Sequence, residues 1–353
     1  MKKALIAMSG GVDSSVAAYL LKEQGYELAG AMMKLYESSD PAVQSGCCSA
    51  DDALDAREVA GRIGIPFYVF NFVEDFAAQV IDRFIDAYQR GETPNPCIDC
   101  NRYLKFERFL RRADELGYDK IATGHYARIV KQGSRWLLKK GVDLSKDQSY
   151  ALYTMTQTQL SRTLIPLGEL SKTQVRELAA AQGLVTADKR DSQDICFAPG
   201  GDYAGFIERQ TGSLPKPGLF KDTQGNTLGE HKGIIHYTVG QRKGLGISAG
   251  HPIYVNKVCP QTNTVVVGGQ EELYAKTLIA RDINLIAAGR LDGPVQLRAK
   301  IRYNQTEQPA TVRQLDEDTL RVEFDQPQRA ITKGQAVVLY DGDVIVGGGV
   351  IGG

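Results

Sequence analysis

The chain has 353 residues, and its 42 lysines and arginines balance 42 aspartates and glutamates, so the formal net charge is zero. Apolar residues make up 42% and charged residues 24%, a composition that excludes a disordered or collagen-like chain. No run of about 18 apolar residues occurs, so we expect no membrane-spanning segment. Six cysteines are few for this length, which favours a reduced, cytoplasmic setting over a disulfide scaffold.

The first 200 residues alternate between strand and helix patterns. The expected strands are 3–8, 28–33, 66–72 and 120–122, and the expected helices are 12–24, 51–63, 76–90 and 101–116. Ser171 and Gln174 form a capping box that begins a further helix, and Gly183 ends it. This alternation predicts an α/β domain with a parallel, doubly wound sheet.

The pattern changes after about residue 200. Prolines and glycines divide the following stretch into short segments, which predicts a small mixed or β central domain. From Thr277 onward apolar and polar residues alternate, and the expected strands are 295–303, 310–315, 319–324, 336–340 and 344–351. Such spacing is typical of a small antiparallel barrel or sandwich. We expect domains over 1–200, 201–275 and 276–353, the last an antiparallel β-barrel.

A glycine-rich loop, Ser9-Gly-Gly-Val-Asp-Ser-Ser15, lies between the first expected strand and the first expected helix. Glycines let the backbone approach an anion, and the N–H groups at a helix N-terminus favour phosphate. The serines add hydroxyl donors, and Asp13 can hold Mg²⁺. No lysine follows the glycines, so this is not a Walker A loop. An ordinary strand–helix turn is the alternative, but five specified positions in this context favour a phosphate site.

This loop resembles the pyrophosphate loop of the ATP-pyrophosphatase superfamily. Enzymes of that superfamily cleave ATP to AMP and pyrophosphate while they adenylate an oxygen of a substrate. The loop alone leaves several substrates open, among them citrulline, xanthylate, deamido-NAD and tRNA bases.

Cys97 and Cys100 form a C-x-x-C motif, and Cys196 lies far away in the sequence. The motif alone leaves zinc, redox or cluster chemistry open, or simply two packed core thiols. Zinc normally takes four ligands, and neither a second C-x-x-C nor a histidine pair is present. A helix is expected from Asn101 onward, so a thiolate of lowered pKa at its N-terminus is reasonable.

Five motifs follow the loop in register. They are TPNPCIDCN (93–101), ATGHYAR (122–128), KDQSY (146–150), DSQDICF (191–197) and GQRKGLGI (240–247). Together with the loop they resemble, over nearly the whole chain, the bacterial tRNA-specific 2-thiouridylase family MnmA. The resemblance implies an adenine nucleotide α-hydrolase-like first domain and ATP-dependent thiolation of C2 of the wobble uridine in tRNA. It also implies Mg²⁺, and a partner protein that donates sulfur.

The resemblance further implies roles for single residues. Cys100 would be the nucleophilic thiol, and Cys196 would carry the persulfide. ATP would contact Ala7, Met8, Ser9, Gly10, Gly11, Val12, Asp13, Ser14, Met33 and Gly124. The target base would contact Asn95, Pro96 and Cys97. Other parts of the tRNA would contact His125, Lys146, Asp147, Gln148, Arg302, Tyr303 and Gln335.

The chain departs from the family pattern at Cys97, where many members carry Asp, as NPDxxCN. The substitution creates a set of three thiols, Cys97, Cys100 and Cys196. Three thiolates can hold a [4Fe-4S] cluster and leave one iron open to an exogenous sulfur. Two mechanisms are therefore open, a persulfide relay and sulfur held on a cluster, and iron and sulfide analysis distinguishes them.

Two other functions compete with tRNA thiolation. One is a pyrophosphate-loop ligase acting on a small molecule, in which a C-terminal barrel and paired thiols would have no role. The other is an iron–sulfur or zinc scaffold that only binds RNA, and the intact loop of residues 9–15 argues against it.

A basic helical face is a further candidate for RNA binding. Arg102, Lys105, Arg108 and Arg112 recur at spacings of three and four residues, so they share one face of the expected helix. This face fits either a phosphate track or an ordinary solvated surface.

Overall fold

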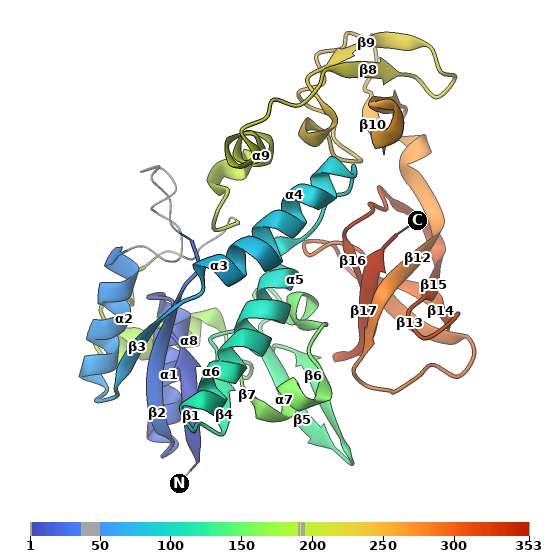
Figure 1. Cartoon of the computed structure of the whole chain (residues 1–353). Helices are drawn as coiled ribbons and strands as arrows, with labels where there is room; N and C mark the ends of the chain where they lie inside the picture. Colours follow the sequence, from blue (N-terminus) through green and yellow to red (C-terminus); the bar gives the residue numbers. More distant parts are fainter. Residues whose placement is uncertain (1, 37–49, 190, 192–194, 353) are drawn as a thin grey trace. The chain divides into compact units, whose positions relative to one another are not determined.

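The computed structural model describes residues 2–36, 50–189, 191 and 195–352 (Figure 1). The chain forms two compact units. The first comprises Met1–Ile81, Pro96–Gly201 and Asp343–Ile345, and the second comprises Asp82–Asn95, Asp202–Gly342 and Val346–Gly353. Across the described ranges, no helix has the length and apolar character needed to cross a bilayer.

A parallel sheet forms the centre of the first unit. Its strands are β1 (Lys3–Ala7), β2 (Glu27–Lys34), β3 (Phe67–Asn71), β4 (Lys120–Ala122) and β7 (Thr163–Leu164), in the order β3-β2-β1-β4-β7. Neighbouring strands pair in parallel, which confirms the predicted α/β sheet. The chain winds from β1 toward β3 and then returns to β4, so the winding reverses between β1 and β4. Ligands of such sheets bind at the carboxyl ends of the strands beside this reversal.

Three helices share a hydrophobic core with β1 and β2. They are α1 (Val12–Glu23), α2 (Ala50–Arg62) and α8 (Lys172–Ala181). Val16 of α1 and Val175 of α8 are fully buried in this core. The predicted capping box of Ser171 and Gln174 is present with both of its hydrogen bonds, and Gly183 follows the helix with φ 59°. The sequence signals thus locate both ends of α8.

A second group of helices carries the C-x-x-C motif. It contains α3 (Val73–Phe76), η1 (Ala77–Ile81), α5 (Pro96–Asp99), η2 (Cys100–Arg108) and α6 (Phe109–Glu115). The elements η1 and η2 are π-helical. The prediction of a helix over 101–116 is confirmed, but the helical backbone already begins at Pro96. Proline suits the first helical position because its φ is fixed and its missing N–H would have no intrahelical partner there.

The first unit also contains a hairpin and three short elements. These are β5 (Ala127–Gln132), β6 (Arg135–Lys140), η3 (Ser149–Leu152), α7 (Gln157–Arg162) and η4 (Pro199–Gly201). β5 and β6 pair in antiparallel register around Gly133, which has φ 59°. Val344 and Ile345 extend this hairpin by pairing with Lys139 and Leu138.

The second unit begins with α4 and a small mixed sheet. Its elements are α4 (Asp82–Gln89), α9 (Tyr203–Thr211), β8 (Gly218–Lys221), β9 (Thr227–His231), η5 (Ile234–His236), β10 (Tyr254–Cys259), η6 (Pro260–Thr262) and β11 (Thr264–Gly268). The strand order is β10-β11-β8-β9, in which β11 and β8 are parallel and the other pairs antiparallel. Phe220, Val255 and Val265 form its core. This agrees with the predicted small mixed central fold.

A closed antiparallel barrel makes up the rest of the second unit, apart from Val344 and Ile345 of its last strand, which belong to the first unit. It contains η7 (Glu271–Leu273), β12 (Tyr274–Leu285), β13 (Val295–Lys300), β14 (Gln308–Gln314), β15 (Leu320–Arg329), β16 (Ala336–Asp341) and β17 (Val344–Ile351). β12 pairs with both β15 and β17, which closes the ring. Leu320, Val322 and Phe324 alternate with exposed residues and point into the core. The barrel prediction is confirmed.

Candidate active site

The glycine-rich loop connects β1 to α1 at the carboxyl edge of the parallel sheet. Gly10 has φ 73°, and a Cβ there would lie 2.3 Å from the Asp52 carbonyl oxygen, so only glycine fits. Gly11 is the N-cap of α1 and has no side chain to cap it. The Ser14 hydroxyl donates to the Gly11 carbonyl at 3.1 Å and accepts from the Ser9 N–H at 3.2 Å. The first N–H groups of α1 can therefore bind an anion.

Two further positions expected to bind ATP lie at the same edge. Gly124 follows β4, and a Cβ there would lie 2.8 Å from the Ser14 nitrogen. Met33 lies near the carboxyl end of β2, where it pairs with Phe70. The structure thus brings residues 7–14, Met33 and Gly124 to the ends of three adjacent strands. Glycine backbone, hydroxyls and a helix N-terminus are donors that suit the phosphates of ATP.

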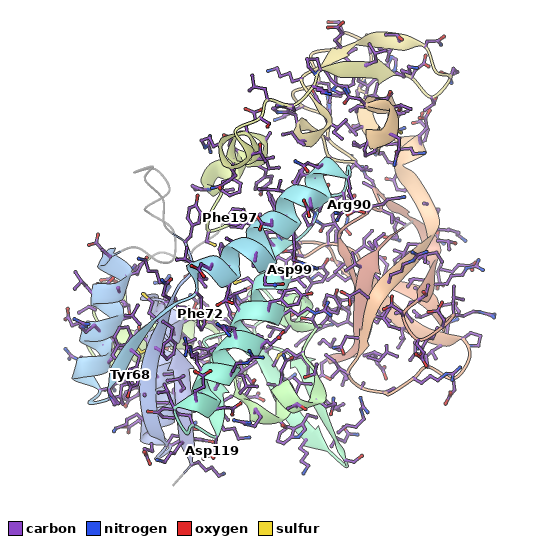
Figure 2. All side chains as sticks on the ribbon, in the orientation of Figure 1. Tyr68, Phe72, Arg90, Asp99, Asp119 and Phe197 are labelled. Carbon is purple, nitrogen blue, oxygen red and sulfur yellow. The ribbon has the colours of Figure 1, made fainter. Side chains whose placement is uncertain are left out.

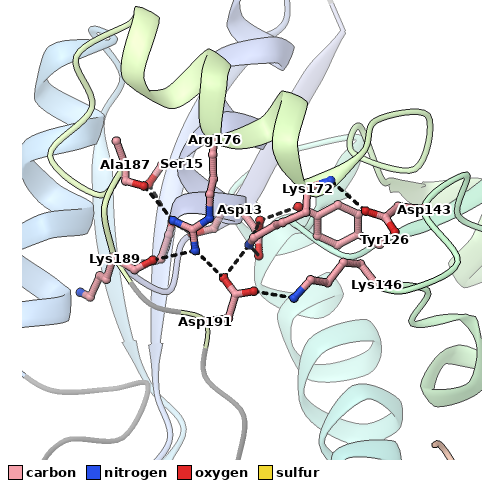
Figure 3. Close-up of polar contacts among 12 residues, drawn as sticks. Asp13, Ser15, Tyr126, Asp143, Lys146, Lys172, Arg176, Ala187, Lys189 and Asp191 are labelled. Carbon is pink, nitrogen blue, oxygen red and sulfur yellow. Dashed lines mark hydrogen bonds and ion pairs between the residues drawn. The ribbon is translucent and has the colours of Figure 1, made fainter.

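The Asp13 carboxylate is held by Lys172 and Tyr126 (Figure 3). Lys172 Nζ lies 2.7 Å from Oδ1 and 2.8 Å from Oδ2, and the Tyr126 hydroxyl donates to Oδ1 at 2.7 Å. Burial, followed by the hydrogen bond to Asp13, raises the pKa of Tyr126. Lys172 is only 9% exposed, so its charge needs partners. No sequence motif marks Lys172, although the capping box places it at the first position of its helix.

Asp191 is a second carboxylate at Lys172. Its Oδ1 lies 2.7 Å from Lys172 Nζ and 3.0 Å from Arg176, and its Oδ2 accepts from Lys146 Nζ at 2.8 Å (Figure 3). Burial alone would raise the pKa of Asp191, but the hydrogen bonds from Lys146 and Lys172 outweigh it and hold the pKa at about 2. We call Asp13, Lys146, Lys172, Arg176 and Asp191 the Lys172 network. Lys146, expected to contact tRNA, belongs to this network.

A neighbouring ion pair anchors the same stretch of chain to α2. Lys189 Nζ lies 2.5 Å from Asp52 Oδ1 and 2.6 Å from Asp55 Oδ2. Residues 189 and 191 are therefore attached to two different parts of the nucleotide edge, α2 and the Lys172 network.

The expected cysteines differ in exposure. Cys97 in α5 is exposed, Cys100 at the start of η2 is buried, and Cys196 is half-buried. Asn95 is the last residue of its segment of the second unit, and the buried Pro96 begins the helix of the first. In the ranges that the structure describes, no three or more His, Cys, Asp or Glu residues form a group suited to a metal ion. Cys97, Cys100 and Cys196 therefore do not form a cluster ligand set in this arrangement.

The segments that carry Cys100 and Cys196 pack on the same stretch of helix. Phe197, labelled in Figure 2, follows Cys196 and is buried. Its ring centroid lies 5.8 Å from that of Phe76 in α3. α3 in turn packs against η2, and η1 packs against α5 and η2. This shared support places both cysteine segments in one region of the first unit.

His125 is half-buried beside the nucleotide edge. Its Nδ1 lies 2.8 Å from the Thr123 hydroxyl, and its ring lies 5.8 Å from that of Phe106. Burial and, to a smaller extent, the charge of Lys105 hold the pKa of His125 well below its ordinary value. The imidazole is therefore neutral at pH 7, and a contact with RNA would be a hydrogen bond or stacking.

Asp147 and Gln148, also expected to contact tRNA, brace the neighbouring backbone. The Asp147 carboxylate accepts from the Gly141 N–H at 3.0 Å and from the Ser149 hydroxyl at 2.8 Å. Gln148 Oε1 accepts from the Tyr126 N–H at 3.0 Å. These contacts position Tyr126, which donates to Asp13.

The remaining expected tRNA residues belong to the second unit. One Arg302 nitrogen donates to two backbone carbonyls and to the Thr332 hydroxyl, the last at 2.8 Å. Gln335 donates to the Thr93 carbonyl at 2.6 Å. Tyr303 is 38% exposed. The contacts of Arg302 and Gln335 stabilise the second unit, and Lys300 Nζ lies 5.5 Å from the centroid of the Tyr303 ring.

Arg108 and Arg112 of the basic helical face pair with nearby acids. Arg108 lies 3.0 Å from Asp75, and Arg112 lies 2.6 Å from Glu115. These pairs favour an ordinary protein surface over a phosphate track.

A parallel sheet whose first strand enters an SGGxDS loop defines a nucleotide-binding domain of the HUP class. Family models described as the tRNA methyl transferase HUP domain, the tRNA methyl transferase PRC-barrel domain and the aminomethyltransferase β-barrel domain match residues 2–200, 204–269 and 275–351. The chain belongs to the tRNA-specific 2-thiouridylase family MnmA, as its curated relatives show.

Two such relatives illustrate the similarity. The tRNA-specific 2-thiouridylase MnmA of Clostridioides difficile (strain 630) is 53% identical, covering 99% of this chain and 98% of the relative. That of Lachnoclostridium phytofermentans is 52% identical, covering 99% of each. Among solved structures, a 4-thiouridine synthetase–RNA complex with bound ATP is 21% identical, covers 56% of this chain and 46% of its own, and has a TM-score of 0.39.

Proposed function

We propose that the chain is an ATP-dependent tRNA-uridine 2-sulfurtransferase that forms 2-thiouridine at the wobble position. The observation that carries the proposal is the presence of the pyrophosphate loop, Cys100 and Cys196 in one compact unit of an MnmA-family chain. The relatives' names, tRNA-specific 2-thiouridylase, support tRNA as the substrate. The same names argue against a small-molecule ligase and against a scaffold that only binds RNA.

Adenylation turns the C2 oxygen of the uridine into a leaving group. The oxygen attacks the α-phosphorus of ATP, pyrophosphate departs, and the base is left as its O2-adenylate. The loop N–H groups and the N-terminus of α1 stabilise the charge that develops on the pyrophosphate. Mg²⁺, when bound, would share that charge, and Asp13 is its candidate ligand once Lys172 gives up the carboxylate.

Sulfur transfer then uses two thiols, those of Cys196 and Cys100. Cys196 carries a persulfide, whose terminal sulfur bonds to C2 while AMP leaves. The Cys100 thiolate attacks the inner sulfur of Cys196 and breaks the persulfide bond, so the transferred sulfur takes the electron pair. The products are 2-thiouridine, AMP and a Cys100–Cys196 disulfide, which a dithiol reductant must clear.

The alternative keeps sulfur on a [4Fe-4S] cluster held by Cys97, Cys100 and Cys196. The described residues do not gather these thiols into a ligand set, so the residues as arranged do not fit a cluster. Anaerobic iron and sulfide analysis tests the relay directly. Iron-free protein with full activity from a persulfide donor supports the relay, and activity that follows iron content overturns it.

The proposal also names two partners, the tRNA and a protein that donates sulfur. The target base would contact Asn95, Pro96 and Cys97, and Tyr303 would contact another part of the tRNA. A persulfide-carrying protein would load Cys196, and a cytoplasmic location follows from the tRNA substrate. The roles of residues 1–200, 201–275 and 276–353 would be adenylation, site closure and tRNA binding.

Mass spectrometry of tRNA from a reconstituted reaction tests the whole proposal. Wild-type protein with ATP, Mg²⁺, a persulfide donor and tRNA should yield 2-thiouridine. ATP–pyrophosphate exchange with and without tRNA is the companion measurement. Exchange that requires tRNA supports the proposal, whereas tRNA-independent exchange indicates a small substrate and absence of any turnover indicates a scaffold.

A further inference from the structure

Lys172 connects the two halves of the proposed reaction. Its ammonium contacts Asp13 in the adenylating loop and Asp191, which lies five positions before Cys196 in the sequence. We propose that Lys172 and Asp191 are positioning residues that hold the thiol-bearing segment against the adenylating loop. The inference rests on the proposed function and assigns roles to two residues, Lys172 and Asp191, for which the family resemblance implied none; Asp191 is the first residue of the motif 191–197.

The contacts single out Lys172 among the cations at Asp191. Arg176 and Lys146 also pair with Asp191, at 3.0 and 2.8 Å. Of Lys146, Lys172 and Arg176, only Lys172 has an ion pair with Asp13 as well, within the described ranges. Its side chain is 11% exposed, so water screens these ion pairs far less than it screens surface pairs.

Contacts of its backbone, its helix and its side chain all fix the position of Lys172. The Lys172 N–H donates to Asp143 at 3.0 Å, in the first turn of the capped helix α8. Val175, one turn later, is buried in the core shared with α1. The Tyr126 ring lies 5.8 Å from Nζ and its hydroxyl contacts Asp13. Side chains locked in this way can hold a site within the narrow tolerance that transfer chemistry needs.

The two reaction steps should therefore respond differently to changes in this network. Asp191→Asn removes the charge that ties the segment to Lys172 and leaves the loop residues unchanged. Lys172→Met breaks both contacts and leaves two carboxylates without their shared cation. Lys172→Arg keeps the charge. Lys189→Met is the matched control, because Lys189 anchors the same segment to Asp52 and Asp55 of α2.

The experiment compares adenylation with sulfur transfer in each full-length variant. tRNA-dependent ATP–pyrophosphate exchange reports the first step, and single-turnover 2-thiouridine formation from persulfide-loaded protein reports the second. Asp191→Asn should lower the second rate at least about tenfold more than the first, a split that general misfolding does not produce. Lys172→Met should lower both rates, and Lys172→Arg should restore part of each. Lys189→Met should change the ratio of the two rates less than about threefold.

A second readout needs no turnover. Iodoacetamide modifies Cys196 at a rate that peptide mass spectrometry measures, and displacement of the segment alters that rate. Asp191→Asn and Lys172→Met should change the Cys196 rate at least about threefold and leave the Cys259 rate unchanged. Equal effects of Lys189→Met and Asp191→Asn in both assays, or no effect of Asp191→Asn in either, would overturn the inference. Wild-type protein that forms no 2-thiouridine would instead refute the proposed function.

Discussion

Single side chains at the nucleotide edge owe their state to partners that are distant in sequence. Asp13 meets Lys172, and Asp191 meets Lys146 and Arg176. Motif patterns identified the loop and the cysteine segments, because local residue types mark them. The role of Lys172 could not be predicted from the sequence. Nothing in the residues around a lysine at the start of a helix shows that it will meet a partly buried carboxylate. The pairing of Lys172 depends on the packing of α8 against α1, the helix whose first turn contains Asp13.

The acid dependence of stability tests the charge state of Asp191. Its pKa is about 2, below the ordinary 3.8, so its carboxylate stabilises the folded state fully above about pH 4 and progressively less toward pH 2. The difference corresponds to about 2 kcal/mol. Asp191→Asn should therefore lower the free energy of unfolding by about 2 kcal/mol at pH 7 and by less at pH 3. Urea unfolding followed by the fluorescence of Trp136 measures both values.

The control for this prediction is Glu58→Gln on the exposed face of α2. It should change the free energy of unfolding by less than about 0.5 kcal/mol at either pH. Equal losses at pH 7 and pH 3 for Asp191→Asn would contradict the assigned ionisation.

Cys196→Ser tests the thiol that carries sulfur. The hydroxyl cannot form a persulfide, so we expect 2-thiouridine formation to be lost while tRNA affinity stays within about twofold of wild type. Mass spectrometry of the tRNA and a binding titration provide the two measurements. Cys259→Ser is the matched control and should leave both unchanged. Turnover near wild type in Cys196→Ser would remove this residue from the mechanism.

Elements with clear periodicity matched the sequence analysis best. β15 alternates buried and exposed residues, and α8 has capping signals at both ends. The helix of the C-x-x-C motif was expected to begin at Asn101, whereas the helical backbone begins at Pro96. The π-helical backbone of η2 also has no sequence signature, since its side chains resemble those of an α-helix. Backbone hydrogen bonding there depends on the packing of neighbouring helices.

Gly124→Ala tests the close approach of β4 to the pyrophosphate loop. The new Cβ would lie 2.8 Å from the Ser14 nitrogen and 2.8 Å from the Asp13 carbonyl carbon, which are backbone atoms. The loop must then shift, and we expect the Kd for ATP to rise at least about tenfold, measured by calorimetric titration. Gly61→Ala in α2 has open space around its Cβ and should leave the Kd unchanged. An unchanged Kd in Gly124→Ala would show that the loop tolerates the methyl group.

At the scale of the whole molecule, both compact units are discontinuous in sequence. The first unit takes Asp343–Ile345 from the hairpin end of the barrel, and the second takes Asp82–Asn95 from between two helical segments of the first. Such exchanges arise from long-range pairing, as between Ile345 and Leu138, and composition along the chain does not record them. The domain boundaries near 200 and 276 remain a prediction. Barrel closure was foreseen as a fold class, but the pairing of β12 with β17 needed the structure.

The nucleotide loop belongs to the first compact unit, so we expect ATP to stabilise that unit more than the second. A ligand at 100 times its Kd stabilises the folded state that binds it by about 2.7 kcal/mol. A non-hydrolysable ATP analogue should therefore slow hydrogen exchange in α1 and α8, beside the loop, more than in β13 and β14 of the barrel. Peptide-resolved mass spectrometry measures these rates, and Gly124→Ala, whose Kd should be at least about tenfold higher, is the control and should show less protection at the same analogue concentration. Equal protection of α8 and β14 would contradict a nucleotide site confined to the first unit.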